Sequence, residues 1–213
     1  MTTVGTATLQ DWIGRFSAAV AEKKDWLTEL DSAIGDADHG ANMSRGMTAV
    51  VEKLGDTAPA TIDELLKGVG MTLVSSVGGA SGPLYGTFFL RTGMTAGAVA
   101  ELDGAGLAAA LRAGLEGIVA RGKPEAGDKT MFDAMAPAVE VFENGVQRGI
   151  PLAEVAAGAA RAAEAGRDAT LPLVARKGRA SYLGERSAGH LDPGAASTAL
   201  LFDALAAAIA GDS

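Results

Sequence analysis

The sequence predicts an all-α fold in a single domain of 213 residues. Over long stretches, apolar residues recur at spacings of three, four or seven, as they do on the buried face of a helix. No stretch alternates apolar and polar residues as a half-exposed strand does, and no internal repeat is present. Clusters of Gly, Asp and Pro interrupt the helical pattern and mark helix ends. A chain of this length can bury a sizeable core.

The first predicted helix begins after Thr8, which we expect to be its N-cap, and it ends at an acidic segment. Its apolar face consists of Leu9, Trp12, Ile13, Phe16, Val20, Leu27 and Leu30. A second helix is predicted from Asn42 to Leu54. The breaker residues Gly55, Asp56 and Pro59 close it.

The remaining helices follow at similar intervals. Thr61 opens a third helix that runs through Leu73 and ends at Gly78 and Gly79. Five more are predicted at Leu84 to Arg91, Asp103 to Arg121, Met131 to Asn144, Pro151 to Ala169 and Ala195 to Ala210. The sequence therefore predicts eight helices joined by glycine-rich loops.

Composition excludes several classes of function. A formal net charge of -8 argues against a nucleic-acid partner, which requires basic patches. The chain has no cysteine, so disulfides and thiol catalysis are excluded. The N-terminal residues lack a basic region and a long apolar run, so we expect no secretory signal and a cytoplasmic protein. The last helix is apolar, but Asp203, Ser197 and Thr198 favour a buried helix over a membrane span.

Three aspartates, Asp31, Asp36 and Asp38, lie within eight residues in the segment LDSAIGDADHGAN. Carboxylates drawn this close repel one another unless a cation is present, and a hard divalent ion such as Mg²⁺ is the usual one. Gly35 and Gly40 let the backbone bend around the acids. The alternative interpretation is a solvated acidic turn at a helix end.

A glycine-rich segment, SSVGGASGPLYG, precedes the fourth predicted helix. Gly78, Gly79 and Gly82 allow close backbone approach, and Ser81 lies beside the helix start. Free amides and a hydroxyl at a helix N-terminus can bind phosphate, although Gly-Ser loops are also often only flexible. The segment lacks the lysine of the pattern GxxxxGK[ST], so a P-loop fold is not indicated.

A second loop, Arg121 to Asp133, carries positive charge. Lys123 and Lys129 supply this charge, and Thr130 is predicted to be the N-cap of the helix that begins at Met131. Basic residues at such positions bind a ligand or are merely solvated. Met131 suits either the core or an apolar wall for a base.

A third loop, Ala175 to Ser197, has no helical pattern. Loops of this length inside a domain are usually functional or disordered. Tyr182, Leu183 and the turn-forming residues Asp192 to Gly194 indicate an ordered loop. His190 is either a proton carrier or a structural residue, and we favour the structural role.

Four segments that occur in this order, IGDADHGANMSRG, SSVGGASGPLYGTFF, RGKPEAGDKTM and RKGRASYLGERSAGHLDPGAAS, together resemble the ADP-binding L subunits of bacterial dihydroxyacetone kinases. The resemblance extends from Leu9 to Ile209. ATP-dependent kinases of this family typically read GDGDCG at the acidic loop, and fatty-acid kinase relatives read PDGDTGTN. This chain has GDADHGAN, which resembles the phosphoenolpyruvate-dependent type.

The resemblance implies a barrel of eight antiparallel helices with the nucleotide bound at one end. It implies that Asp31, Asp36 and Asp38 are the catalytic and metal-binding residues, holding two Mg²⁺ ions that bridge the phosphates. Residues matching the phosphate and sugar contacts are His39, Gly40, Ala41, Asn42, Ala80 and Ser81. Those matching the nucleoside contacts and the loop that closes over ADP are Gly122, Met131, Arg179, Asp192, Pro193 and Gly194.

The implied function is phosphoryl transfer, in which ADP stays bound as a coenzyme. The nucleotide would receive a phosphoryl group from a phosphohistidine on an M subunit and pass it to dihydroxyacetone held by a K subunit. One alternative is a subunit of an ATP-dependent kinase for dihydroxyacetone or erythrulose. Another is a regulatory module whose ADP form binds a transcription factor. The sequence leaves formation of a homodimer open.

Overall fold

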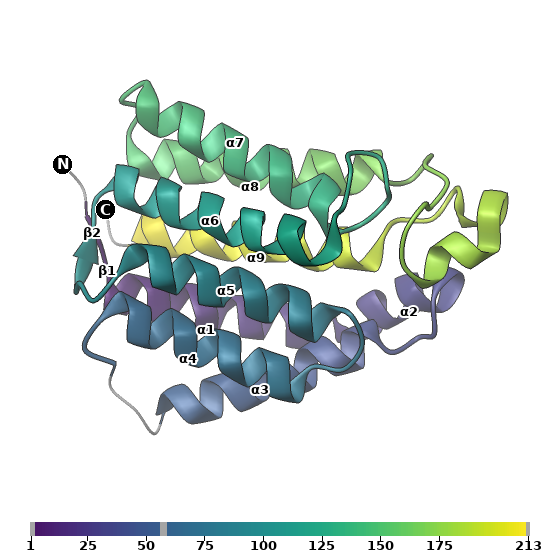
Figure 1. Cartoon of the computed structure of the whole chain (residues 1–213), viewed down its shortest axis with the longest axis horizontal. Helices are drawn as coiled ribbons and strands as arrows, with labels where there is room; N and C mark the ends of the chain where they lie inside the picture. Colours follow the sequence, from purple (N-terminus) through teal and green to yellow (C-terminus); the bar gives the residue numbers. More distant parts are fainter. Residues whose placement is uncertain (1–2, 56–58, 212–213) are drawn as a thin grey trace.

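The computed structural model describes residues 3–55 and 59–211, and this part of the chain is almost entirely helical (Figure 1), which confirms the all-α prediction. Its elements are β1 (Val4–Gly5), α1 (Thr6–Glu22), α2 (Lys24–Ile34), α3 (His39–Gly55), α4 (Ile62–Ser76), α5 (Ser81–Ala96), β2 (Glu101–Leu102), α6 (Gly104–Gly122), α7 (Met131–Gln147), α8 (Leu152–Ala169), the 3₁₀ helix η1 (Arg179–Ser187) and α9 (Pro193–Gly211). The predicted breaker Asp56 lies outside the described residues.

Eight long helices, α1 and α3 to α9, form a closed ring. Each packs against the next in the chain, and α9 returns to pack against α1. Consecutive members run in opposite directions (Figure 1). The arrangement buries one apolar face of every helix in a shared core, as amphipathic helices require, and it is consistent with the expected eight-helix barrel.

The N-terminal helix predicted as one element is two helices. Lys23 leaves the helical region, with φ of -95° and ψ of 11°, so that α1 ends at Glu22 and α2 starts after the break. This break was not visible in the sequence, because the local residues include no glycine or proline. The prediction of Thr8 as N-cap is also wrong: Gly5 is the N-cap, and Thr8 is buried inside α1.

Three segments without a predicted element contain short regular structure. The third loop includes η1, a 3₁₀ helix with a kink at Gly184. Near the N-terminus, β1 pairs antiparallel with β2, and Val4 lies opposite Leu102. The glycine-rich loop is also shorter than predicted, because α5 begins at Ser81 and not near Leu84.

The two ends of the ring differ in character (Figure 1). The chain termini and the β1–β2 pair lie at one end. The other end carries α2, η1 and the connections that follow α4, α6 and α8. All three loops singled out in the sequence therefore meet at the same end.

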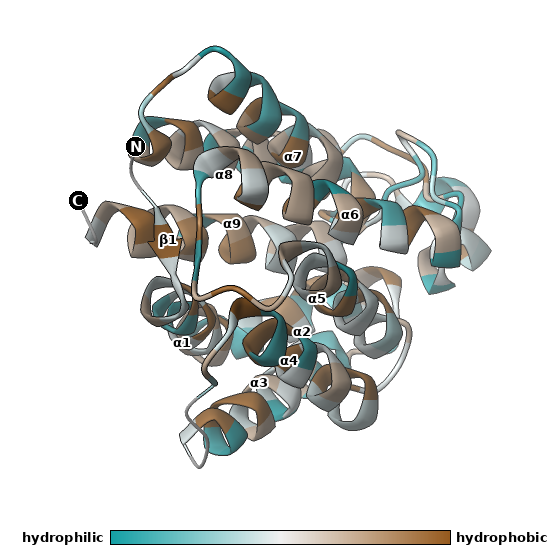
Figure 2. Ribbon diagram, turned by 60° about the vertical axis from the view of Figure 1, so that its left-hand side comes forward, coloured by the Kyte–Doolittle hydropathy of each residue, from teal (hydrophilic) through white to brown (hydrophobic). Residues whose placement is uncertain are grey.

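Helix α9 is long and apolar enough to cross a membrane by length and composition alone, but 61% of its most apolar window is buried. It packs against α1, α7 and α8. Figure 2 shows its mostly apolar ribbon between α1 and α8. The predicted buried helix is therefore what the structure contains, and Asp203 lies on its exposed side.

Candidate functional site

An acidic cluster lies where α2 turns into α3. Oxygen atoms of Asp31, Asp36 and Asp38 lie within 4.8 Å of one another. Asp31 is buried at the end of α2, whereas Asp36 and Asp38 retain access to solvent. A group of carboxylate oxygens with an open side is the donor set that Mg²⁺ prefers.

The backbone around the cluster is built for a tight turn. Oδ2 of Asp31 accepts hydrogen bonds from the backbone N–H groups of Asp38 (2.8 Å) and His39 (3.0 Å), which fixes the start of α3. A Cβ atom at Gly35 would overlap the Asp31 carboxylate, so only glycine fits there. Ala37 adopts a left-handed conformation with φ of 59°, which is strained for a residue with a side chain.

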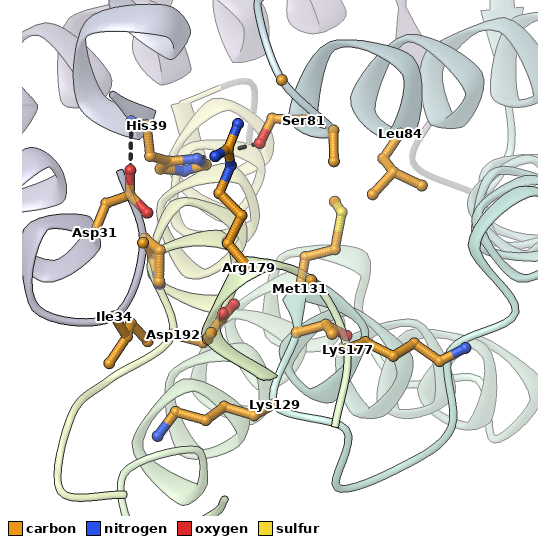
Figure 3. Close-up of a pocket in the computed structure, with 18 of the residues that line it drawn as sticks. Asp31, Ile34, His39, Ser81, Leu84, Lys129, Met131, Lys177, Arg179 and Asp192 are labelled. Carbon is orange, nitrogen blue, oxygen red and sulfur yellow. Dashed lines mark hydrogen bonds between the residues drawn. The ribbon is translucent and has the colours of Figure 1, made fainter. Parts of the chain in front are cut away.

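Arg179, at the start of η1, reaches the acidic cluster from the third loop. Its guanidinium lies 3.0 Å from Oδ2 of Asp36. Figure 3 shows the Arg179 side chain extending into the pocket toward His39 and Ser81. Ile34 of α2 packs with Ala175 and Ala180 in a small second core, which holds η1 beside α2. The apolar contact therefore brings a cation to the carboxylates across more than 140 residues of sequence.

His39 links the acidic turn to the glycine-rich loop. Its ring is buried, and its Nδ1 lies 3.1 Å from Oγ of Ser81 (Figure 3). Its Nε2 lies 2.9 Å from Oγ of Ser197. Burial lowers the pKa of His39, against the opposing effect of the Asp31 and Asp38 charges. His39, one of the two positions at which GDADHG differs from GDGDCG, is thus held from both sides by hydroxyl groups.

The glycine-rich loop places the N-terminus of α5 at the pocket. Gly79 has φ of +67°, and a Cβ on Gly82 would overlap the carbonyl oxygen of Val77. Ala80 and Ser81 therefore present the free amides of the first turn of α5 near the acidic cluster. Free amides and the helix dipole favour an anion at this point.

These groups line a pocket of about 340 Å³. Its other side is apolar. Leu84 and Ile118 face this side together with Pro124 and Met131, beside Gly122 at the end of α6. Thr130 and Asp133 form a capping box that starts α7 at Met131, as predicted for Thr130. The pocket therefore offers charge and amides on one side and an apolar wall on the other.

Lys129 has a role that the sequence did not reveal. Its side chain is buried, and Nζ donates hydrogen bonds to the carbonyl oxygens of Thr170 (2.9 Å), Leu173 (3.0 Å) and His190. Burial lowers the pKa of this lysine. The positive charge of Lys129, which we had expected at a ligand or in solvent, therefore joins the two ends of residues 170–190. We call this junction the neck of the third loop. The His190 side chain itself is exposed and does not line the pocket.

Asp192 also lies at this neck, immediately before α9. Its Oδ2 accepts a hydrogen bond from the N–H of Ala195 (2.7 Å), and its own N–H donates to Oγ1 of Thr170 (3.0 Å). Burial raises the pKa of the Asp192 carboxyl to about 7. Pro193 and Gly194 follow it along the pocket wall.

The structure brings almost all residues expected at the site to one pocket. Those that line it are Asp31, Asp36, Asp38, His39, Asn42, Ala80, Ser81, Gly122, Met131, Arg179, Asp192, Pro193 and Gly194. Gly40 and Ala41 do not line it. Gly40 instead lies against α2, where a Cβ would overlap the carbonyl oxygen of Lys24.

Fold and pocket together define a class of protein domain. Its members are rings of antiparallel helices that carry an acidic cluster and a helix N-terminus at one end. The chain belongs to the DAK2 domain family, whose model matches residues 33–207. It is 46% identical to the ADP-binding subunit DhaL of the PEP-dependent dihydroxyacetone kinase of Escherichia coli (strain K12), over 93% of this chain and 94% of that one. It is 48% identical to the DhaL subunit of PEP-dependent dihydroxyacetone kinase 1 of Listeria innocua, over 91% and 92%.

A solved structure matches over nearly the whole chain. The dihydroxyacetone kinase of C. freundii, in complex with AMP-PNP and Mg²⁺, superposes with a TM-score of 0.73 at 26% identity. The match covers 97% of this chain and 35% of that kinase, so this chain spans about a third of its length. The kinase therefore contains a further region with no counterpart here.

Proposed function

We propose that this chain is the ADP-binding, phosphoryl-transferring subunit of a PEP-dependent dihydroxyacetone kinase in the cytoplasm. ADP stays bound as a coenzyme. It accepts a phosphoryl group from a phosphohistidine on an M subunit, and the group then passes to dihydroxyacetone held on a K subunit. The names of the DhaL relatives, which cover more than nine tenths of this chain, support this function.

One observation carries the proposal: three carboxylates and the N-terminus of α5 face the same pocket. A nucleoside diphosphate has charged phosphates at one end and a flat base at the other. The polar side of the pocket, between Asp38 and Ser81, suits the phosphates. The apolar side, around Leu84 and Met131, suits the base.

The acidic cluster fits Mg²⁺ because all of its donors are carboxylate oxygens. Asp31, Asp36 and Asp38 would hold two ions between them. Bound Mg²⁺ supplies charge neutralisation for the phosphates and for the transferring group. Asp31 already uses one oxygen to fix the backbone, so its orientation is set before any ion binds.

Other residues of the chain bind the phosphates of the nucleotide and orient them. The amides at the start of α5 and the hydroxyl of Ser81 donate to phosphate oxygens, and Arg179 adds a positive charge beside Asp36. Phosphoryl transfer needs alignment and charge neutralisation more than covalent help, so the chain needs no nucleophile. The hydroxyl that accepts the phosphoryl group is then activated on the K subunit.

The nucleotide content of the purified protein tests this function. We expect ADP to survive extensive desalting in Mg²⁺ and to leave when a chelator is added. Asp38→Asn should release ADP even in Mg²⁺, whereas Asp203→Asn, an exposed aspartate on α9, should retain it. ADP that stays bound in chelator, or in Asp38→Asn, would contradict the metal assignment.

A further inference from the structure

A chain of buried polar side chains runs from the barrel core to the pocket. The hydroxyl of Tyr85 lies 3.0 Å from Oγ1 of Thr198 and 2.7 Å from Oγ of Ser197. Oγ of Ser197 lies 2.9 Å from Nε2 of His39, whose Nδ1 lies 3.1 Å from Oγ of Ser81. Tyr85, Ser197 and Thr198 are fully buried, and Ser81 reaches the pocket. Helices α3, α5 and α9 each contribute to it.

The hydrogen bonds in such a chain are coupled in direction, because each hydroxyl has one proton to donate. If Nδ1 of His39 is an acceptor, the hydroxyl of Ser81 donates its only proton to the ring. It can then only accept hydrogen bonds from groups in the pocket. If His39 donates from Nδ1, Ser81 accepts from the ring and its own proton is free. Only the second direction suits a phosphate, which is an acceptor.

The buried end of the chain favours this second direction. A phenol is a more acidic hydroxyl than that of serine and therefore the better donor, and the shortest link joins Tyr85 to Ser197. Burial raises the pKa of Tyr85 to about 12, so the phenol keeps its proton. Ser197, having accepted from Tyr85, donates to Nε2 of His39 at 2.9 Å. The alternative acceptor, the carbonyl oxygen of Gly194, lies at 3.1 Å.

We propose that Tyr85 and Ser197 are positioning residues: they direct the Nδ1–H of His39 at Ser81, so that the Ser81 hydroxyl donates to a phosphate oxygen of the bound nucleotide. The identity of that phosphate rests on the proposed function. The direction of the hydrogen bonds does not, because it is a property of the protein before any ligand binds. His39 thus acts through Ser81 and accepts no phosphoryl group itself.

Nitrogen NMR of the histidine rings tests the direction in the protein without nucleotide. The chain has two histidines, and His190→Gln assigns the signals of His39 by elimination. We expect a pyrrole-type Nδ1, which carries the proton, together with a pyridine-type Nε2, which accepts from Ser197. A pyridine-type Nδ1 would overturn the proposal, whatever nucleotide the protein binds.

Variants test the two positioning residues. Tyr85→Phe and Ser197→Ala should each shift the His39 ring signals and weaken ADP binding by about tenfold, with adenosine binding unchanged. Tyr182→Phe is the matched control, because Tyr182 is the other tyrosine and is 88% exposed. Unchanged ring signals in both variants would overturn the proposal. Wild-type protein that binds no ADP would overturn the proposed function and leave the NMR result to decide the hydrogen-bond direction.

Discussion

Lys129 donates a hydrogen bond to the carbonyl oxygen of His190, 61 residues further along the chain. The same ammonium group holds the carbonyl oxygens of Thr170 and Leu173, so one side chain ties together both ends of the loop that carries Arg179. A buried lysine is costly unless it is hydrogen-bonded, and here three carbonyl groups satisfy it. Hydrogen bonds within the chain therefore hold this loop at the pocket without help from a bound ligand.

Replacing this lysine should loosen the loop. Lys129→Met removes the ammonium donor from three carbonyl groups, of which that of Thr170 is buried, and leaves an uncharged side chain in its place. We therefore expect the free energy of unfolding to fall by about 3 kcal/mol. Hydrogen exchange of residues 171–191 should accelerate. Lys24→Met is the control, because Lys24 is exposed on α2, outside this loop, and its loss should leave both measurements nearly unchanged. If the two variants lowered the free energy of unfolding and accelerated exchange equally, Lys129 would not be what holds the two ends of the loop together.

Replacing Ala37 by glycine should make the protein more stable. Its φ of 59° costs an L-residue about 1–2 kcal/mol, and glycine would recover most of this after its larger loss of backbone entropy. We expect Ala37→Gly to stabilise the metal-free protein by about 0.5–1 kcal/mol in chemical denaturation. Ala49→Gly, inside α3, should destabilise it by a similar amount. A loss of stability in Ala37→Gly would contradict the strained turn.

Asp192 should make stability depend on pH. Its pKa is raised from its ordinary value of 3.8 to about 7 in the folded protein, so the folded state binds more protons between these values. The contribution of this group to stability is therefore fully favourable below about pH 4. It falls by up to ~1.4 kcal/mol per pH unit as the pH rises toward 7.

Asp192→Asn isolates this effect because asparagine keeps a side-chain oxygen for the N–H of Ala195. We expect the variant to be more stable than the wild type at pH 8 and no more stable at pH 4, by thermal or chemical denaturation. Asp203→Asn, on the exposed side of α9, should show no such dependence. If the free energies of unfolding of the wild type and of Asp192→Asn changed in parallel with pH, the raised pKa of the buried Asp192 carboxyl would be refuted.

Helix periodicity predicted the all-α class and most helices, since most of them have a clear apolar face, whereas α9 is apolar almost all round. The break at Lys23 was missed because no glycine or proline marks it. Most residues named from the motifs and the resemblance line one pocket, and their binding roles stay predictions. Lys129 could not be assigned, because its partners are main-chain oxygens 41 to 61 residues away and leave no trace in residue types.

The fate of the bound nucleotide in excess labelled Mg-ATP tests the central claim most directly. If ADP is a coenzyme rephosphorylated in place, the unlabelled ADP should remain bound during prolonged incubation. It should gain a phosphoryl group only from a phosphohistidine donor. Rapid replacement of ADP by labelled ATP, with transfer of the label to dihydroxyacetone in the presence of the K subunit, would contradict the account and identify an ATP-dependent kinase.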